Sequence, residues 1–161
     1  MYYSHKTTGR PYEKNLGWCT HYIDCPNAPL YPFGFGLSFT TFQYSDIRLD
    51  RREISQSDTL KATVTLKNRR QFDGEEIVQM YIRDLKASIT RPVKELKGFQ
   101  KIRLRKGEEK EVTFSTPEPM LRFYDQDLAC HSEPGEFKVF IGSSSMDVKE
   151  ASFYLVDSLE K

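Results

Sequence analysis

The histidines and cysteines are the residues of this sequence most suited to nucleophilic chemistry, and they are few. His5 and His21 lie in an irregular N-terminal stretch, and His131 directly follows Cys130. Nucleophilic catalysis needs a Ser or Cys beside a base that a third group orients. Neighbouring side chains of a strand point to opposite faces, so Cys130 and His131 are not expected to form such a pair. No Gly-x-Ser-x-Gly, phosphate loop or dinucleotide fingerprint is present.

Cys19 and Cys25 allow three interpretations. They lie six residues apart in a stretch rich in Pro and Asn. All the cysteines could be free thiols, or these two could close a disulfide in an exported protein. A zinc site would use His21 between them, but no second Cys-x-x-Cys or His-x-x-x-His supplies the other ligands. The sequence therefore predicts no metal site and no cofactor site.

Acidic residues are numerous, and a glycosidase needs two carboxylates facing one sugar about 5–9 Å apart. The acids fall at predicted turns or on the outer faces of strands: Asp73, Glu75, Glu76, Glu108, Glu109, Glu111, Asp125 and Asp127. Carboxylates at turns are usually solvated or bind their own backbone, so we expect surface groups. The run 125–127 resembles the start of a calcium loop, but the Gly and Glu required downstream are missing.

Composition argues against several classes of function. The 161 residues carry 24 Lys and Arg against 23 Asp and Glu, a net charge of +1. This balance gives no electrostatic support for binding nucleic acid or an anionic membrane. No apolar run exceeds four residues, at 153–156, and the first residues lack the layout of a secretion signal. The 13% aromatic content argues against disorder and predicts a thin, aromatic core.

The first 40 residues predict an irregular arm. Gly and Pro interrupt them every few residues, and neither supports a regular element here. The segment is nevertheless aromatic, and its rings and prolines include Trp18, Tyr31, Pro32, Phe33 and Phe35. A free linker would not carry so much apolar surface, so we expect residues 1–40 to pack on the chain itself or on a neighbouring domain. The same rings could instead stack on the flat faces of sugars.

From residue 41 onward, alternation with period two predicts an all-β domain that occupies 41–161. The predicted strands are 42–49, 60–67, 76–84, 93–104, 111–115, 137–141 and 151–155, with a short piece at 121–125. Seven or eight short strands without a helix of ten residues are typical of an antiparallel sandwich or barrel. Lys61, Lys67 and Lys138 on outer faces fit the protection of exposed edges, which a barrel does not have. The sequence therefore predicts an antiparallel β-sandwich, immunoglobulin-like or fibronectin type III-like.

The strand predicted at 76–84 differs from the others because both of its faces are apolar. Met80 and Ile82 lie on one face, and Ile77 and Tyr81 lie on the other. A strand covered on both faces belongs in the middle of a sheet. We therefore expect it to be a central strand.

One long motif resembles a known enzyme family. Tyr31-Pro-Phe-Gly-Phe-Gly-Leu-Ser-Phe-Thr-Thr-Phe42 is similar to the Pro-Phe-Gly-(Tyr/Phe)-Gly-Leu-Ser-(Tyr/Phe)-Thr stretch of family 3 glycoside hydrolases, the β-glucosidase and β-xylosidase type. Upstream, 2–11 and 22–31 resemble the end of the α/β sandwich domain of those enzymes and the connector that follows it. The segments that resemble their C-terminal fibronectin type III-like domain are 73–84, 91–99, 123–125 and 133–137.

The resemblance implies a non-catalytic part of a longer enzyme. In that family, catalysis belongs to an N-terminal (β/α)8 barrel and the α/β sandwich after it. An Asp nucleophile lies in a Ser-Asp-(Trp/Tyr/His) motif, and a Glu usually supplies the general acid/base. The Ser-Asp pairs here, at Asp46 and Asp58, do not match that motif. Both catalytic groups are thus expected outside this chain, in a periplasmic or secreted parent that hydrolyses β-glucosides or related β-glycosides.

The resemblance also implies the partners of the chain. The arm would buttress the barrel and α/β sandwich of the parent, and the interface residues would be Trp18, Tyr31, Pro32, Phe33 and Phe35. The loop 85–92 would reach the active-site rim with Ser88 and Arg91, where Arg91 could bind an oligosaccharide or a partner carboxylate. Arg91 could equally just shape the entry to the next strand. Two alternatives are a free-standing module that binds carbohydrate or protein, and a weak homodimer formed through the arm.

Overall fold

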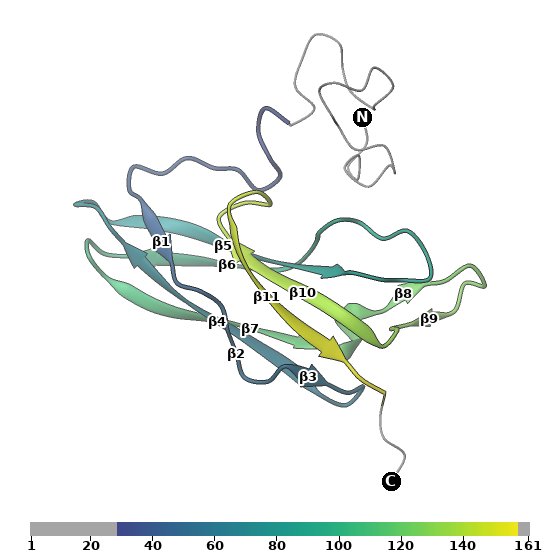
Figure 1. Ribbon diagram of the computed structural model, residues 1–161. Helices are drawn as coiled ribbons and strands as arrows, with labels where there is room; N and C mark the ends of the chain where they lie inside the picture. The colour runs from purple at the N-terminus through teal and green to yellow at the C-terminus, as the bar shows by residue number, and fades with distance from the viewer. Residues whose placement is uncertain (1–28, 158–161) are drawn as a thin grey trace, which may run out of the picture.

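The computed structural model describes residues 29–157, which form two packed, mainly antiparallel sheets and one small two-stranded sheet (Figure 1). The strands are β1 (Phe42–Tyr44), β2 (Arg48–Leu49), β3 (Glu53–Ile54), β4 (Thr59–Asn68), β5 (Gly74–Asp84), β6 (Glu95–Leu104), β7 (Glu109–Pro117), β8 (Phe123–Tyr124), β9 (Cys130–His131), β10 (Gly135–Gly142) and β11 (Val148–Leu155). Helical structure in these residues is limited to one 3₁₀ turn, Glu118–Leu121. No helix in the described part of the chain could span a bilayer. The predicted β-sandwich is confirmed.

The smaller sheet is built around β4. Strand β7 pairs along one edge of β4, while β1 and β2 share the other edge. The strand predicted at 42–49 is therefore split in two, because three residues, 45–47, lie opposite only two residues of β4. An extra residue of this kind is a β-bulge, which bends a strand and ends regular pairing.

The larger sheet has the strand order β3-β11-β10-β5-β6. Strand β5 lies between β10 and β6, which confirms its predicted central position. Strand β3 pairs with β11 in parallel, so the chain leaves the smaller sheet after β2 and joins the larger one. The two-residue strands β3 and β9 were not predicted, because two residues are too few to show a period, whereas β8 falls within the short piece predicted at 121–125.

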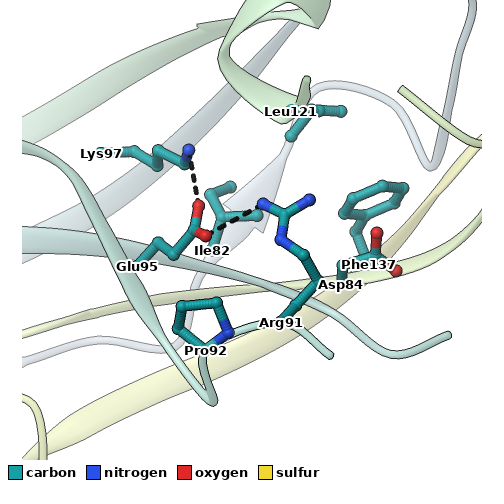
Figure 2. A pocket seen from close by; sticks show the side chains of 8 residues that line it. All are labelled: Ile82, Asp84, Arg91, Pro92, Glu95, Lys97, Leu121 and Phe137. Atoms are coloured by element: carbon teal, nitrogen blue, oxygen red, sulfur yellow. Dashed lines mark hydrogen bonds and ion pairs between the residues drawn. The ribbon is translucent and has the colours of Figure 1, made fainter. Parts of the chain in front are cut away.

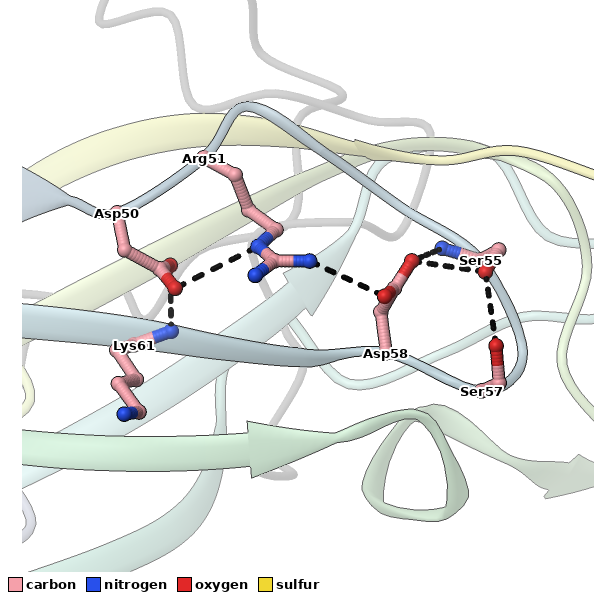
Figure 3. A network of polar contacts seen from close by, with 6 residues as sticks. All are labelled: Asp50, Arg51, Ser55, Ser57, Asp58 and Lys61. Atoms are coloured by element: carbon pink, nitrogen blue, oxygen red, sulfur yellow. Dashed lines mark hydrogen bonds and ion pairs between the residues drawn. The ribbon is translucent and has the colours of Figure 1, made fainter.

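A network of polar contacts fixes the crossing between the sheets (Figure 3). The backbone N–H of Lys61 donates to Asp50 over 2.8 Å, and the backbone N–H and hydroxyl of Ser55 both donate to Asp58 over 2.8 Å. The guanidinium of Arg51 lies between the two carboxylates, 3.4 Å from Asp50 and 3.1 Å from Asp58. Hydrogen bonds from Ser55 lower the pKa of Asp58 below its ordinary value. Asp58 is thereby committed to the turn that precedes β4.

The core between the sheets is mainly aliphatic, so the prediction of an aromatic core was wrong. Its aromatic members are Phe114, Phe137 and Phe153, and the last two stack with ring centroids 5.5 Å apart. The remaining buried members include Ile54, Leu60, Ala62, Val64, Leu66, Val78, Met80, Ile82, Leu104, Val112, Val139, Ile141 and Leu155. Alternating aliphatic residues fill the narrow space between two sheets. Most described aromatic residues lie elsewhere, on outer faces and in the arm.

Candidate functional site

Residues 29–40 contain no strand and pass over the outer face of the larger sheet, the face turned away from the core (Figure 1). The carbonyl oxygen of Phe33 accepts a hydrogen bond of 2.9 Å from the backbone N–H of Ser145, in the β10–β11 turn. The ring of Phe33 meets the ring of Tyr81 on β5 edge-on, with centroids 6.5 Å apart. Thr40 is buried, and its hydroxyl donates to the side chain of Asn68 over 2.5 Å. This segment is therefore held against the sandwich.

Gln79 is the polar side chain that fixes the course of the arm. It stands on the outer face of β5 and is only 4% exposed. Its amide donates to the carbonyl oxygens of Gly34, over 3.0 Å, and Ser143, over 2.6 Å, and its oxygen accepts from Tyr81 over 2.5 Å. A buried amide stabilises a fold only when its hydrogen bonds are made, as they are here. Sequence reasoning missed this role, although one polar residue on an apolar strand face was a signal.

Gly34 is the residue that this contact requires. Its φ of +80° lies in the left-handed region, and a Cβ there would stand 1.9 Å from the side-chain oxygen of Gln79. Only glycine fits such a close approach without strain. By contrast, a Cβ on Gly36 would meet nothing within 4 Å. Within the motif 31–42, the structure thus requires glycine at Gly34 but leaves room for a side chain at Gly36.

The rings of the predicted anchors project outward even though their backbone is held. Tyr31 is 66% exposed, Phe33 52% and Phe35 47%, and the rings of Tyr31 and Phe35 lie 5.1 Å apart. Pro32 is half-buried, and its carbonyl oxygen accepts from the N–H of Phe35. Trp18 lies outside the described residues, as do Cys19 and Cys25. The interface role of these residues remains a prediction.

A groove of about 580 Å³ lies between the arm and the neighbouring strands. Its apolar lining comes from Phe33, Phe35 and Leu37 of the arm, Ile77 of β5, and Leu96 and Phe99 of β6. The acidic residues Glu75, Glu76 and Asp147 also contribute to this lining. Burial raises the pKa of Glu76 to about 7, and the charge of Asp147 adds to this rise. The groove is thus apolar with acidic groups beside it.

Arg91 lies in the loop between β5 and β6, packed into the protein (Figure 2). It donates to Glu95 over 2.9 Å, and its guanidinium carbon lies 4.4 Å from the centre of the Phe123 ring. Its side chain is only 11% exposed. Burial alone would raise the pKa of Glu95, but hydrogen bonds from Lys97 and Arg91 outweigh it and lower the pKa. The cavity beside these groups, about 10 Å³, has no room for a sugar.

Ser88 is exposed and ties the same loop to the segment after β9. Its backbone N–H donates to Glu133 over 2.9 Å, and hydrogen bonds from Ser88 lower the pKa of Glu133. His131 lies with one ring nitrogen 3.6 Å from Asp125 and the other 3.8 Å from Glu133. Because Asp125 and Glu133 lie beside opposite nitrogens of the ring, the three side chains do not converge on one metal ion. Within residues 29–157 no three His, Cys, Asp or Glu side chains gather as a metal site.

The predicted rim positions therefore have internal partners, and their approach to an active site stays a prediction. The inward orientation of Arg91 favours the alternative in which it shapes the entry to β6. Of the two Ser-Asp pairs, Asp58 serves the turn described above, and Asp46 has a side chain that is 95% exposed and lies 3.2 Å from Lys149. Both aspartates have the surroundings of surface groups.

Comparison with known proteins agrees with this architecture. The family described as fibronectin type III-like domain matches residues 76–145. The chain is 46% identical over 158 residues to the periplasmic β-glucosidase of Salmonella typhimurium. This alignment covers 97% of the chain and 21% of the enzyme. The crystal structure of β-glucosidase from Listeria innocua superposes with a TM-score of 0.89 at 41% identity, covering 98% of this chain and 22% of the other.

A third relative carries the family designation itself. The GH3 β-glucosidase of Bifidobacterium adolescentis superposes with a TM-score of 0.71 at 37% identity, covering 78% of this chain and 18% of the other. The chain thus spans about a fifth of the length of the relatives it matches. The chain therefore carries a fibronectin type III-like domain of the type found in the family 3 β-glucosidases.

Proposed function

We propose that this chain is a non-catalytic module that supports the catalytic domains of a family 3 glycoside hydrolase acting on β-glucosides or related β-glycosides. The observation that carries the proposal is the asymmetry of the match, which takes in 97% of this chain but 21% of a β-glucosidase. Such an enzyme has about four fifths of its length beyond the aligned part. The catalytic Asp and Glu would come from that remainder.

The arm supplies the means of support. Burying an aromatic ring stabilises a contact by about 1.5–3 kcal/mol, and Tyr31, Phe33 and Phe35 are all about half-exposed or more. Gln79 already holds the backbone beside them. An interface that is ordered before it binds loses less conformational entropy on binding, so the arm suits a permanent contact between domains.

The same relatives suggest where the parent enzyme works. The Salmonella typhimurium relative is named a periplasmic β-glucosidase. We therefore propose a periplasmic or secreted parent.

Two experiments test the proposed function. The 161-residue chain, incubated with aryl β-glucosides and aryl β-xylosides, should give no turnover above a buffer control, and turnover would contradict the proposal. In the second experiment, the matching stretch of the Salmonella typhimurium enzyme is deleted or replaced by this chain. Deletion should lower the unfolding temperature and the activity, and replacement should restore both. Equal behaviour of the deleted and replaced enzymes would show that the module gives no support.

A further inference from the structure

We propose that the outer face of strands β5 and β6 docks on the catalytic domains together with the arm, so that the interface is a sheet face carrying Ile77, Leu96 and Phe99. This inference rests on the proposed function and names the surface that performs it. These three side chains lie outside the motif that led to the arm, and nothing in their sequence pattern alone marks them as interface residues.

The first observation is their exposure beside other apolar groups. Ile77 is 40% exposed, Leu96 38% and Phe99 66%. Single exposed apolar residues are ordinary on a protein surface. Here, however, all three line one groove with Phe33, Phe35 and Leu37 of the arm. Apolar side chains gathered around one concave surface are typical of a binding site.

The second observation is a β-bulge that turns two of these side chains to the same face. Phe99 lies opposite Gln79, and Leu96 lies opposite Tyr81, although Gln79 and Tyr81 are two residues apart and Leu96 and Phe99 are three apart. In a regular strand, positions three apart face opposite sides. The extra residue in β6 shifts this alternation by one position, so the side chains of Leu96 and Phe99 both project outward. Bulges that re-aim side chains are frequent beside functional sites.

The chemistry of the groove favours a polypeptide over a sugar. Rings that could stack on a sugar line the groove at Phe33, Phe35 and Phe99. Leu37, Ile77 and Leu96 add branched aliphatic surface, which offers a sugar neither stacking nor hydrogen bonds. Glu75 is already paired with Lys101 over 2.6 Å. The carboxylate of Asp147, which accepts from the hydroxyl of Ser143 over 2.7 Å, belongs to a residue that also lines the groove, and it would complement a basic side chain of the partner. The occupant that fits is an apolar polypeptide surface with a basic residue at its edge.

The position of the groove identifies which polypeptide this is. Arm residues Phe33, Phe35 and Leu37 form one of its walls, so a domain that contacts the arm would also reach Leu96 and Phe99. The relatives provide such a domain, because about four fifths of their length lies beyond the aligned part. We therefore assign the groove to the catalytic domains of the parent enzyme.

The test uses the replacement enzyme described above, in which this chain stands in the Salmonella typhimurium β-glucosidase. Phe99→Ser is compared with Phe72→Ser, a matched control because Phe72 is 65% exposed and lies in the β4–β5 loop, away from the groove lining. Phe99→Ser should lower the unfolding temperature of the replacement enzyme by about 2–4 °C, and Phe72→Ser should leave it unchanged. The isolated chain should unfold at the same temperature with either substitution.

Each outcome separates this inference from the proposed function. If the unsubstituted chain fails to restore the enzyme, the proposed function fails. If it restores the enzyme and Phe99→Ser has no effect, the proposed docking face is wrong. Saturable binding of laminaribiose to the isolated chain, lost in Phe99→Ser, would assign the groove to a sugar instead. A dimer in sedimentation that Phe99→Ser dissociates would assign it to a second copy.

Discussion

In two regions of the molecule, the loop that contains Arg91 and the outer face of β5 and β6, the exposure of the side chains is the opposite of what their residue types suggest. The loop that contains Arg91 carries a cationic side chain that looks suited to binding a ligand, yet Arg91 contacts Glu95 and Phe123 of the domain itself. The outer face of β5 and β6 carries residues that look like core, yet Leu96 and Phe99 are exposed beside a groove. The cavity at the charged loop measures about 10 Å³, and the groove about 580 Å³.

The difference shows which residues are free to act outside the domain. The Arg91 side chain is nearly buried and is held by Glu95 and Phe123, so little of it can reach a ligand outside the domain. An apolar side chain that remains in water after folding still gains free energy from burial, at about 25 cal/mol per Å². We therefore expect this module to interact through its apolar face.

The largest effect on the isolated chain should come from the charged loop. Arg91→Ala should lower the free energy of unfolding by about 2–4 kcal/mol, because it removes a nearly buried ion pair and a cation–π contact. Chemical denaturation of the isolated chain measures this. Arg105→Ala is the control, since its side chain is exposed, and it should change stability by less than about 0.5 kcal/mol. Equal stability of the two variants would mean that Arg91 is not structural.

A smaller effect should come from the hold on the arm. Gly34→Ala should lower the free energy of unfolding by about 1–2 kcal/mol, because alanine is strained at φ +80° and its Cβ would meet Gln79. Gly36→Ala, where a Cβ meets nothing within 4 Å, should be neutral. Denaturation of the isolated chain distinguishes the two. If both variants behaved alike, the arm would not be part of the folded domain.

An effect of similar size to that of Gly34→Ala, but one that depends on pH, should come from Glu76. The pKa of Glu76 is raised from 4.5 to about 7, chiefly by burial. The stability linked to its protonated form is fully present below pH 4.5 and is lost as the pH rises toward 7. Allowing for screening at a half-exposed group, this loss should be about 1–2 kcal/mol.

Denaturation at pH 4 and pH 8 measures this loss as the difference between the unsubstituted chain and Glu76→Gln, because acids with lowered pKa, such as Asp58 and Glu133, change stability in the opposite direction. Glu76→Gln should remove most of it, and the exposed Glu53→Gln should not. If the Glu76→Gln variant lost as much stability as the unsubstituted chain, the pH dependence would come from other groups.

The regular part of the fold could be predicted from the sequence. Alternation marked the inward residues of β4, and apolar residues on both faces marked β5 as central. The bulge in β6 could not be predicted, because it depends on pairing with β5. The inward orientation of Arg91 could not be predicted either, since Glu95 and Phe123 approach it only in the folded sandwich.

The central claim is that the exposed apolar face is where this module meets the rest of an enzyme. Hydrogen–deuterium exchange tests it directly, in the isolated chain and in the replacement enzyme. Amides at 33–38 and 96–99 should exchange more slowly in the replacement enzyme, and those of the hairpin 123–131 should not change. Equal exchange at 33–38 and 96–99 in both proteins would contradict it.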